Sequence, residues 1–117
     1  GTLATTGGYV PSDSRYKNQV NGLRGALSII QSLNPVDYFY KTNDFPEMNF
    51  PKVKNYGFIA QDVEKILPEI VGKDNEGYYM LNYVELIPIL TKALKEQQTQ
   101  IDKLKSQIES LILLKKK

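Results

Sequence analysis

The chain has 117 residues, and its 15 lysines and arginines against 13 aspartates and glutamates leave a formal net charge of +2. This length predicts a single domain. Cysteine, histidine and tryptophan are absent, which excludes disulfides, thiolate nucleophiles, Ser-His-Asp catalysis and zinc sites built from Cys and His ligands. Hydrophobic residues at 41% and charged residues at 24% are typical of a globular protein with a modest core.

The charge and hydropathy patterns also limit the partners. Removing the terminal cluster 115–117 takes three positive charges from +2 and leaves −1, so we expect no nucleic acid partner. No stretch approaches the roughly 20 apolar residues of a membrane span, and nothing resembles a signal peptide, so we expect no membrane partner. Because the chain begins with Gly1 rather than Met, we expect a fragment of a longer protein. The lack of cysteine leaves the compartment unknown.

The N-terminal third predicts a linker, a helix and a strand. Residues 1–11 are small and polar, which indicates a linker or the end of an upstream stalk. Apolar residues at helical spacing predict a helix from about Gln19 to Leu33, stopped by Asn34-Pro35. The aromatic-rich segment Val36–Tyr40 predicts a strand with alternate side chains on one face.

The middle of the chain predicts short elements. An irregular loop with two prolines is expected over 42–55, followed by a second strand at Tyr56–Ile59. A short helix is expected from Gln61 to Leu67. Strands at Glu69–Val71 and Tyr78–Leu81 flank a polar run that ends in glycine, and this arrangement predicts a hairpin.

The last third predicts a long helix. Asn82 offers an N-cap and Glu85 follows three residues later, as in a capping box. The helical pattern then runs to about Leu114, which gives a rod of about 50 Å. Pro88 is expected to kink or divide this helix, because proline cannot donate a backbone hydrogen bond.

The second part of this helix alternates apolar spacings of three and four, which is typical of a coiled coil. The seam at positions a and d comprises Leu94, Gln97, Ile101, Leu104, Ile108 and Leu111. The alternative is one amphipathic helix lying on its own domain, but the helix is too long for a small domain to cover. We therefore predict an α+β fold, with a domain over 12–88 and a C-terminal helix over 89–117 that forms a coiled coil with copies of itself; three heptads do not define the number of helices.

One short segment could carry chemistry. Without His or Cys, a nucleophile must be a hydroxyl or an amine, and Ser12 and Lys17 supply such a pair. A lysine acts as a base only when it is neutral, which requires desolvation or a nearby cation, and Arg15 is close in sequence. A gap of five residues does not place the pair on one helical face, but a turned segment can fold the lysine back onto the hydroxyl. On spacing alone, Ser12-Asp13 favours a turn or an N-cap over a catalytic pair.

Other polar groups predict no site. Asp62 and Glu64 point to different sides of a helix, and the glycines form no phosphate loop. The acidic run 74–76 departs from the EF-hand spacing and is explained by a hairpin turn. The eight tyrosines are expected in packing, because no basic stripe accompanies them. We therefore expect no metal and no cofactor.

Several motifs occur in a distinctive order: Ser12-Asp13-x-Arg15-x-Lys17, then Gly57-Phe58-Ile59-Ala60-Gln61-Asp62-Val63-Glu64, Leu67-Pro68-Glu69 and Ala93-Leu94-Lys95-Glu96. In combination they resemble the C-terminal intramolecular chaperone domain of phage tailspikes and tail fibres. This is the endosialidase-type, self-cleaving serine/lysine peptidase family, and a related domain occurs in the myelin regulatory factor. The resemblance covers about residues 12–104.

The resemblance implies a domain that aligns three chains of a homotrimeric fibrous protein and, in many members, then cuts itself off. It implies that Ser12 is the nucleophile, that Lys17 is the general base and acid, and that the bond between Pro11 and Ser12 is broken. Asp13 and Arg15 would have supporting roles. The implied partners are copies of the same chain and its upstream fibrous stalk, in a phage or prophage virion fibre or a bacterial surface protein.

Three alternatives stay open at this point. The first is a permanent trimerisation cap that never cuts. The second is a receptor-binding tip, whose contact residues would be exposed Tyr40, Phe45 and Phe50 in the Pro-rich loop. The third is the oligomerising segment of a transcription factor, which would need an upstream basic domain.

Overall fold

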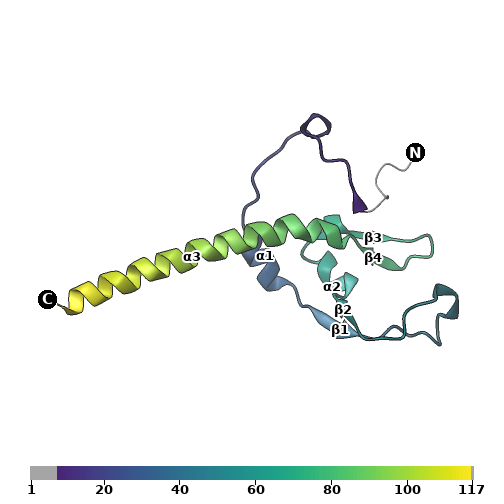
Figure 1. Ribbon diagram of the computed structural model, residues 1–117. Coiled ribbons are helices and arrows are strands. Elements are labelled where there is room, and N and C mark those ends of the chain that lie inside the picture. The colour runs from purple at the N-terminus through teal and green to yellow at the C-terminus, as the bar shows by residue number, and fades with distance from the viewer. Residues whose placement is uncertain (1–7, 117) are drawn as a thin grey trace.

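The computed structural model describes residues 8–116 (Figure 1). Its helices are α1 (Ala26–Ser32), α2 (Ala60–Glu64) and α3 (Leu86–Lys115), and its strands are β1 (Val36–Tyr38), β2 (Asn55–Gly57), β3 (Val71–Lys73) and β4 (Tyr79–Leu81). One-turn 3-10 helices lie at η2 (Ser14–Tyr16), η3 (Pro46–Met48), η4 (Pro68–Ile70) and η5 (Tyr83–Glu85). The expected α+β class is confirmed. The first seven residues of the expected linker lie outside the described residues.

Helix α1 begins at Ala26, so the predicted start near Gln19 is wrong. Gln19 and Gly25 have positive φ angles of 50° and 68°, and this left-handed backbone cannot continue a helix. Gly25 at the N-cap has no side chain to accept a hydrogen bond. The carboxylate of Glu96 on α3 does so instead, accepting from the N–H of Gly25 at 3.1 Å and of Leu27 at 2.7 Å.

Strands β1 and β2 form a two-stranded antiparallel sheet, in which Val36 pairs with Gly57. Both strands were expected, but each is displaced or shortened. The first ends at Tyr38 rather than at residue 40. The second ends at Gly57 rather than at residue 59, because the N–H of Phe58 donates to the Tyr83 hydroxyl at 3.2 Å instead of continuing the ladder. Alternate residues of β1 are half-buried, as predicted.

Strands β3 and β4 form the predicted hairpin, with Val71 opposite Leu81. The first strand begins at Val71, two residues later than expected, because η4 precedes it. Asp74 holds the turn: its Oδ1 accepts from the N–H groups of Glu76 and Tyr78, both at 2.9 Å. Gly77 adopts a φ of 87°, which glycine reaches without a steric penalty.

The core lies where the short elements meet α3. It is formed by four buried apolar residues. Val63 lies in α2, Leu67 between α2 and η4, Ile70 in η4 and Leu86 in α3. Helix α2 ends at Glu64, three residues before the predicted end. Nearby, α1 packs against α3. Ala26 and Ala93 are almost fully buried at this contact, and their short side chains permit a close approach of the two helices.

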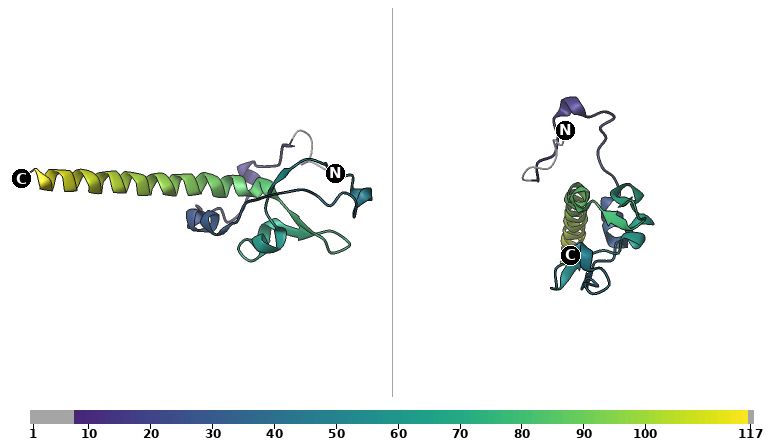
Figure 2. Two further views of the ribbon diagram at one scale, coloured as in Figure 1. Left: turned by 90° about the horizontal axis from the view of Figure 1, so that it is seen from below. Right: turned by 90° about the vertical axis from the view of Figure 1, so that its right-hand side faces the viewer.

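Helix α3 runs unbroken for 30 residues, or about 45 Å, and Figure 2 shows it as a straight rod extending beyond the body. The predicted break at Pro88 is wrong. Pro88 is the third residue of α3, where a backbone N–H has no partner within the helix anyway. The predicted capping box is also absent, since Asn82 makes no side-chain cap and its N–H donates to the carbonyl of Ile70 at 2.8 Å. The expected domain division at residue 88 falls within the first turn of α3.

The long loop between β1 and β2 is held by aromatic pairs. Tyr40 stacks on Phe50 with ring centroids 4.2 Å apart, and Tyr38 meets Tyr40 edge-on at 5.1 Å. Phe45 contacts Tyr78 of the hairpin edge-on at 5.9 Å. Tyr40, Phe45 and Phe50 are half-buried in these contacts, so the expectation that they are exposed is wrong.

Gly57→Ala is expected to destabilise the fold, because a Cβ at this position would overlap the Tyr83 hydroxyl and lie 3.3 Å from the Tyr38 ring. We expect a loss of about 1–3 kcal/mol in the free energy of unfolding, as is typical of overpacking. Urea denaturation at one protein concentration measures it. Gly72→Ala is the matched control, since a Cβ there meets nothing within 4 Å; equal stability of the two variants would contradict the prediction.

The pKa of Tyr38 is raised to about 12, first by the hydrogen bond with the Tyr40 hydroxyl, at 3.2 Å between oxygens, and then by burial. The ordinary value is 10.0, so the folded state holds this proton more tightly than the unfolded chain. The resulting stabilisation is complete below pH 10 and is lost as the pH rises through about 12.

Tyr40→Phe removes this hydrogen bond and is expected to lower the pKa of Tyr38 toward its ordinary value. Ultraviolet titration of the phenolates should then lose its last step near pH 12. Tyr16→Phe is the control, because Tyr16 is 75% exposed and its removal should leave that step in place. A step that survives in Tyr40→Phe would refute the assigned cause.

Candidate functional site

Ser12 and Lys17 meet, because the chain between them forms a tight turn. The one-turn helix η2 occupies residues 14–16, with backbone N–H groups of Tyr16 and Lys17 donating to the carbonyls of Asp13 and Ser14. This turn carries Lys17 back toward Ser12, and Lys17 Nζ donates to Ser12 Oγ at 2.7 Å. The turned geometry that the sequence allowed is therefore present.

Asp13 and Arg15 hold this turn. The Asp13 carboxylate accepts from the backbone N–H of Arg15 at 2.8 Å and from the guanidinium at 2.9 and 3.0 Å. These hydrogen bonds, first from the side chain and then from the backbone, lower the pKa of Asp13, while the carboxylate raises the pKa of Arg15. The pair is well exposed, so its contribution is to the shape of the turn more than to overall stability.

The segment that carries this pair stands away from the body, and we call residues 8–24 the arm. Every residue of the arm is exposed, and Figure 1 shows it rising clear of α3 before it turns back. Tyr9, Tyr16 and Val20 are 75–81% exposed. Among the described residues, no part of the body covers these side chains.

Helix α3 presents two different faces. Leu86, Ala93 and the half-buried Glu96 face the chain's own α1 and α2. The predicted seam is exposed, with Leu94 at 66% and Leu111 at 61%, and every described residue from 101 onward is exposed. The same spacing continues one heptad earlier, through Ile87 and Leu90, which are 61% and 45% exposed. Neither residue belongs to the predicted seam, which begins at Leu94.

Two residues that join distant parts of the fold were given no role from the sequence. Glu96 caps α1 from 69 and 71 residues away, and Tyr83 receives the N–H of Phe58. Glu96 lies in α3, and Tyr83 lies in η5 directly before α3. Both contact short elements that are distant in the sequence. The one sequence signal concerns Glu96, which follows the buried Ala93 by three residues and therefore lies on the same face of α3.

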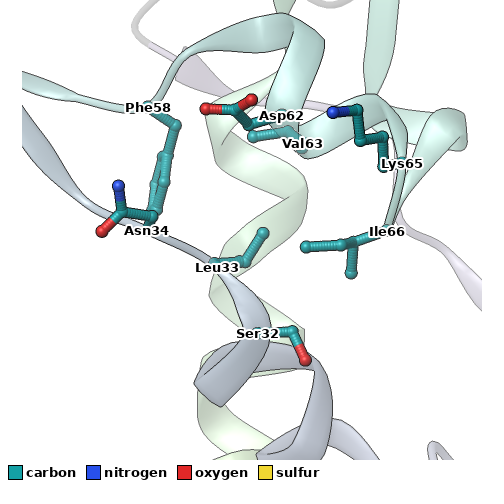
Figure 3. A pocket seen from close by; sticks show the side chains of 8 residues that line it. All are labelled: Ser32, Leu33, Asn34, Phe58, Asp62, Val63, Lys65 and Ile66. Atoms are coloured by element: carbon teal, nitrogen blue, oxygen red, sulfur yellow. The ribbon is translucent and has the colours of Figure 1, made fainter.

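A pocket of about 310 Å³ lies between the end of α1 and α2 (Figure 3). Apolar side chains of Leu33, Phe58, Val63 and Ile66 line it, with Asp62 and Lys65 beside them.

Within residues 8–116, no three His, Cys, Asp or Glu side chains cluster as metal ligands would. No helix in that range is long and apolar enough to cross a membrane.

Comparison with known proteins gives a consistent result. Residues 12–72 match the model of a protein family described as chaperone of endosialidase. The match begins at Ser12 and includes the turn, α1, both strands of the first sheet, α2 and the start of the hairpin.

Two curated relatives are long tail fibre proteins. The chain is 37% identical over 90 residues to Gp37 of Escherichia phage AR1, an alignment covering 75% of this chain and 8% of that protein. It is 27% identical over 105 residues to Gp37 of Salmonella phage S16, covering 87% of this chain and 14% of that protein. The chain therefore corresponds to a small part of each relative.

Proposed function

The chain belongs to the chaperone of endosialidase family, and from this premise we propose that it is the intramolecular chaperone of a tail-fibre-like protein. In this proposal three copies pair through α3, bring their fibrous segments into register, and then release the fibre by a single self-cleavage between Pro11 and Ser12. The long tail fibre relatives support the fibre context.

The observation that carries the assembly role is the exposed seam of α3. Its apolar residues Leu94, Ile101, Leu104, Ile108 and Leu111 are 40–66% exposed in the single chain. Burial of such side chains between helices is strongly favourable, and their alternating spacing matches knobs-into-holes packing. Every described residue of α3 from 97 onward is exposed, and Figure 1 shows this part of α3 extending away from the body, so copies of α3 are the natural covering surface.

Registering copies in this way solves a folding problem specific to fibres. Strands contributed by separate chains form contacts of high sequence separation, and the entropy of bringing them together delays folding. A helical bundle at one end raises the effective concentration of the chains for each other and fixes their relative position. Subsequent removal of the bundle leaves the fibre kinetically trapped.

The observation that carries the cleavage role is the 2.7 Å contact between Ser12 Oγ and Lys17 Nζ. Neutral Lys17 would accept the hydroxyl proton while Ser12 Oγ adds to the carbonyl carbon of Pro11. Lys17 would then return the proton to the departing amine of Ser12 as the carbon–nitrogen bond breaks. Water would hydrolyse the resulting ester to a Pro11 carboxylate and a free Ser12 hydroxyl, so the new chain begins at Ser12.

The exposure of the pair supports a link between assembly and cleavage. In the described single chain, the Ser12 and Lys17 side chains are exposed and lie 2.7 Å apart. A lysine acts as a base only in its neutral form, and covering the arm with another surface would favour that form by desolvation. Assembly of the copies and the fibrous segment would supply such a surface, so cleavage would follow assembly.

Ser12→Ala and Lys17→Ala are expected to abolish cleavage while leaving assembly intact, because both side chains are exposed and belong to no core. Intact mass of the full-length protein measures this, and wild type should yield a fragment beginning at Ser12. Ser14→Ala, two residues away in the same turn, is the matched control and should still cut. If wild type also stays whole while forming trimers, the domain is a permanent trimerisation cap.

Ile101→Asp is expected to dissociate the oligomer, because it places a charge at the centre of the seam. Analytical ultracentrifugation should show trimers for wild type at micromolar concentration and mainly monomers for the variant. Ser106→Asp is the control, since it adds the same charge to an exposed α3 position outside the seam. A monomeric wild type would refute the assembly role.

A further inference from the structure

Among the residues that the structure describes, the arm makes no hydrogen bond to the rest of the molecule. Among the described residues, every hydrogen bond of residues 8–24 stays within that segment. The first long-range hydrogen bond comes at the next residue, where the N–H of Gly25 donates to Glu96 Oε2 at 3.1 Å. The direction in which the arm leaves the body therefore depends on this point.

Packing does little to fix the root of the arm. Residues 21–24 and Lys92 of α3 line a hollow of about 680 Å³, and Leu23 is still 45% exposed. Gly25 turns the chain with a φ of 68°, and a Cβ there would meet nothing within 4 Å. Where side chains do not enclose a segment, directional hydrogen bonds become its main restraint.

Glu96 is placed to supply that restraint. Its second oxygen, Oε1, accepts from the N–H of Leu27 at 2.7 Å, so one carboxylate spans the point where the arm becomes α1. The buried alanines Ala26 and Ala93 bring α1 close enough to α3 for this reach. Along α3, Glu96 stands between the seam residues Leu94 and Gln97.

We propose that Glu96 is a positioning residue for the cleavage reaction. Glu96 fixes the start of α1, next to the arm, to α3, the helix that also carries the seam. The pairing of α3 helices then determines where Ser12 and Lys17 lie. Glu96 acts through Gly25 and Leu27 and touches neither Ser12 nor the bond to be cut. This inference rests on the function proposed above, and it adds how the cleavage segment is held in place.

The first test measures the rate constant for release of the Ser12 fragment from the full-length protein. Glu96→Ala should cut about 10- to 100-fold more slowly, since a reacting segment that is poorly held loses its effective concentration. Glu96→Gln should recover part of the rate, because its amide oxygen can still accept a hydrogen bond. Assembly is followed in parallel and should be unchanged in both variants.

Two controls separate positioning from general stability. Val63→Ala creates a cavity in the core, where Val63 is 1% exposed, and should destabilise the fold without slowing cleavage. Glu109→Ala removes an exposed carboxylate from the same helix and should also cut at the wild-type rate. If Val63→Ala slows cleavage as much as Glu96→Ala does, loss of stability explains the effect and the proposal fails.

The second test measures the position of the arm without reference to cleavage. The chain has no cysteine, so Tyr16→Cys and Lys105→Cys provide two specific positions for spin labels. The labelled protein is diluted with unlabelled copies, and the distance between the two labels is measured. We expect a narrow distribution of this distance with Glu96 and a broad one with Glu96→Ala. A distribution that stays narrow in Glu96→Ala would overturn the proposal. If it broadens while wild type never cuts, the anchor is upheld and only the proposed cleavage is refuted.

Discussion

The packing of α1 and α2 against the first turns of α3 is the interaction on which the rest of the structure depends. Val63, Leu67, Ile70 and Leu86 enclose a small core, and the two short sheets and the aromatic loop extend outward from it. The same helix is a core element in its first turns and a fully exposed rod in its last. Folding of the body therefore also sets the orientation in which the apolar seam is presented.

Local patterns predicted the elements that local interactions hold. The hairpin could be predicted, because the Asp74 carboxylate and Gly77 form its turn from neighbouring residues. The long helix could be predicted from its heptads. The start of α1 could not, since Val20 and Leu23 fit a helical spacing while the left-handed backbone at Gly25 and its remote cap determine where the helix begins. Pro88 likewise has a smaller effect than predicted, because proline is tolerated near a helix start.

The candidate site shows the same division. Sequence reasoning could name Ser12 and Lys17 and allow that a turn joins them, because residues within six positions can meet through a single turn. It could not identify Glu96, whose hydrogen bond to Gly25 spans 71 positions. Its spacing from Ala93 places Glu96 on the inward face of α3, but no local pattern shows that a glutamate caps another helix. Such long-range caps become visible only when the fold brings the two helices together.

The confinement of Ser12 and Lys17 to six consecutive residues has an evolutionary consequence. Their contact is made by one turn, held by Asp13 and Arg15, and none of these residues belongs to the core. Selection can therefore alter the pair by single substitutions without disturbing the body or the seam. The side chains of this segment can diverge much faster than the core, on one unchanged scaffold.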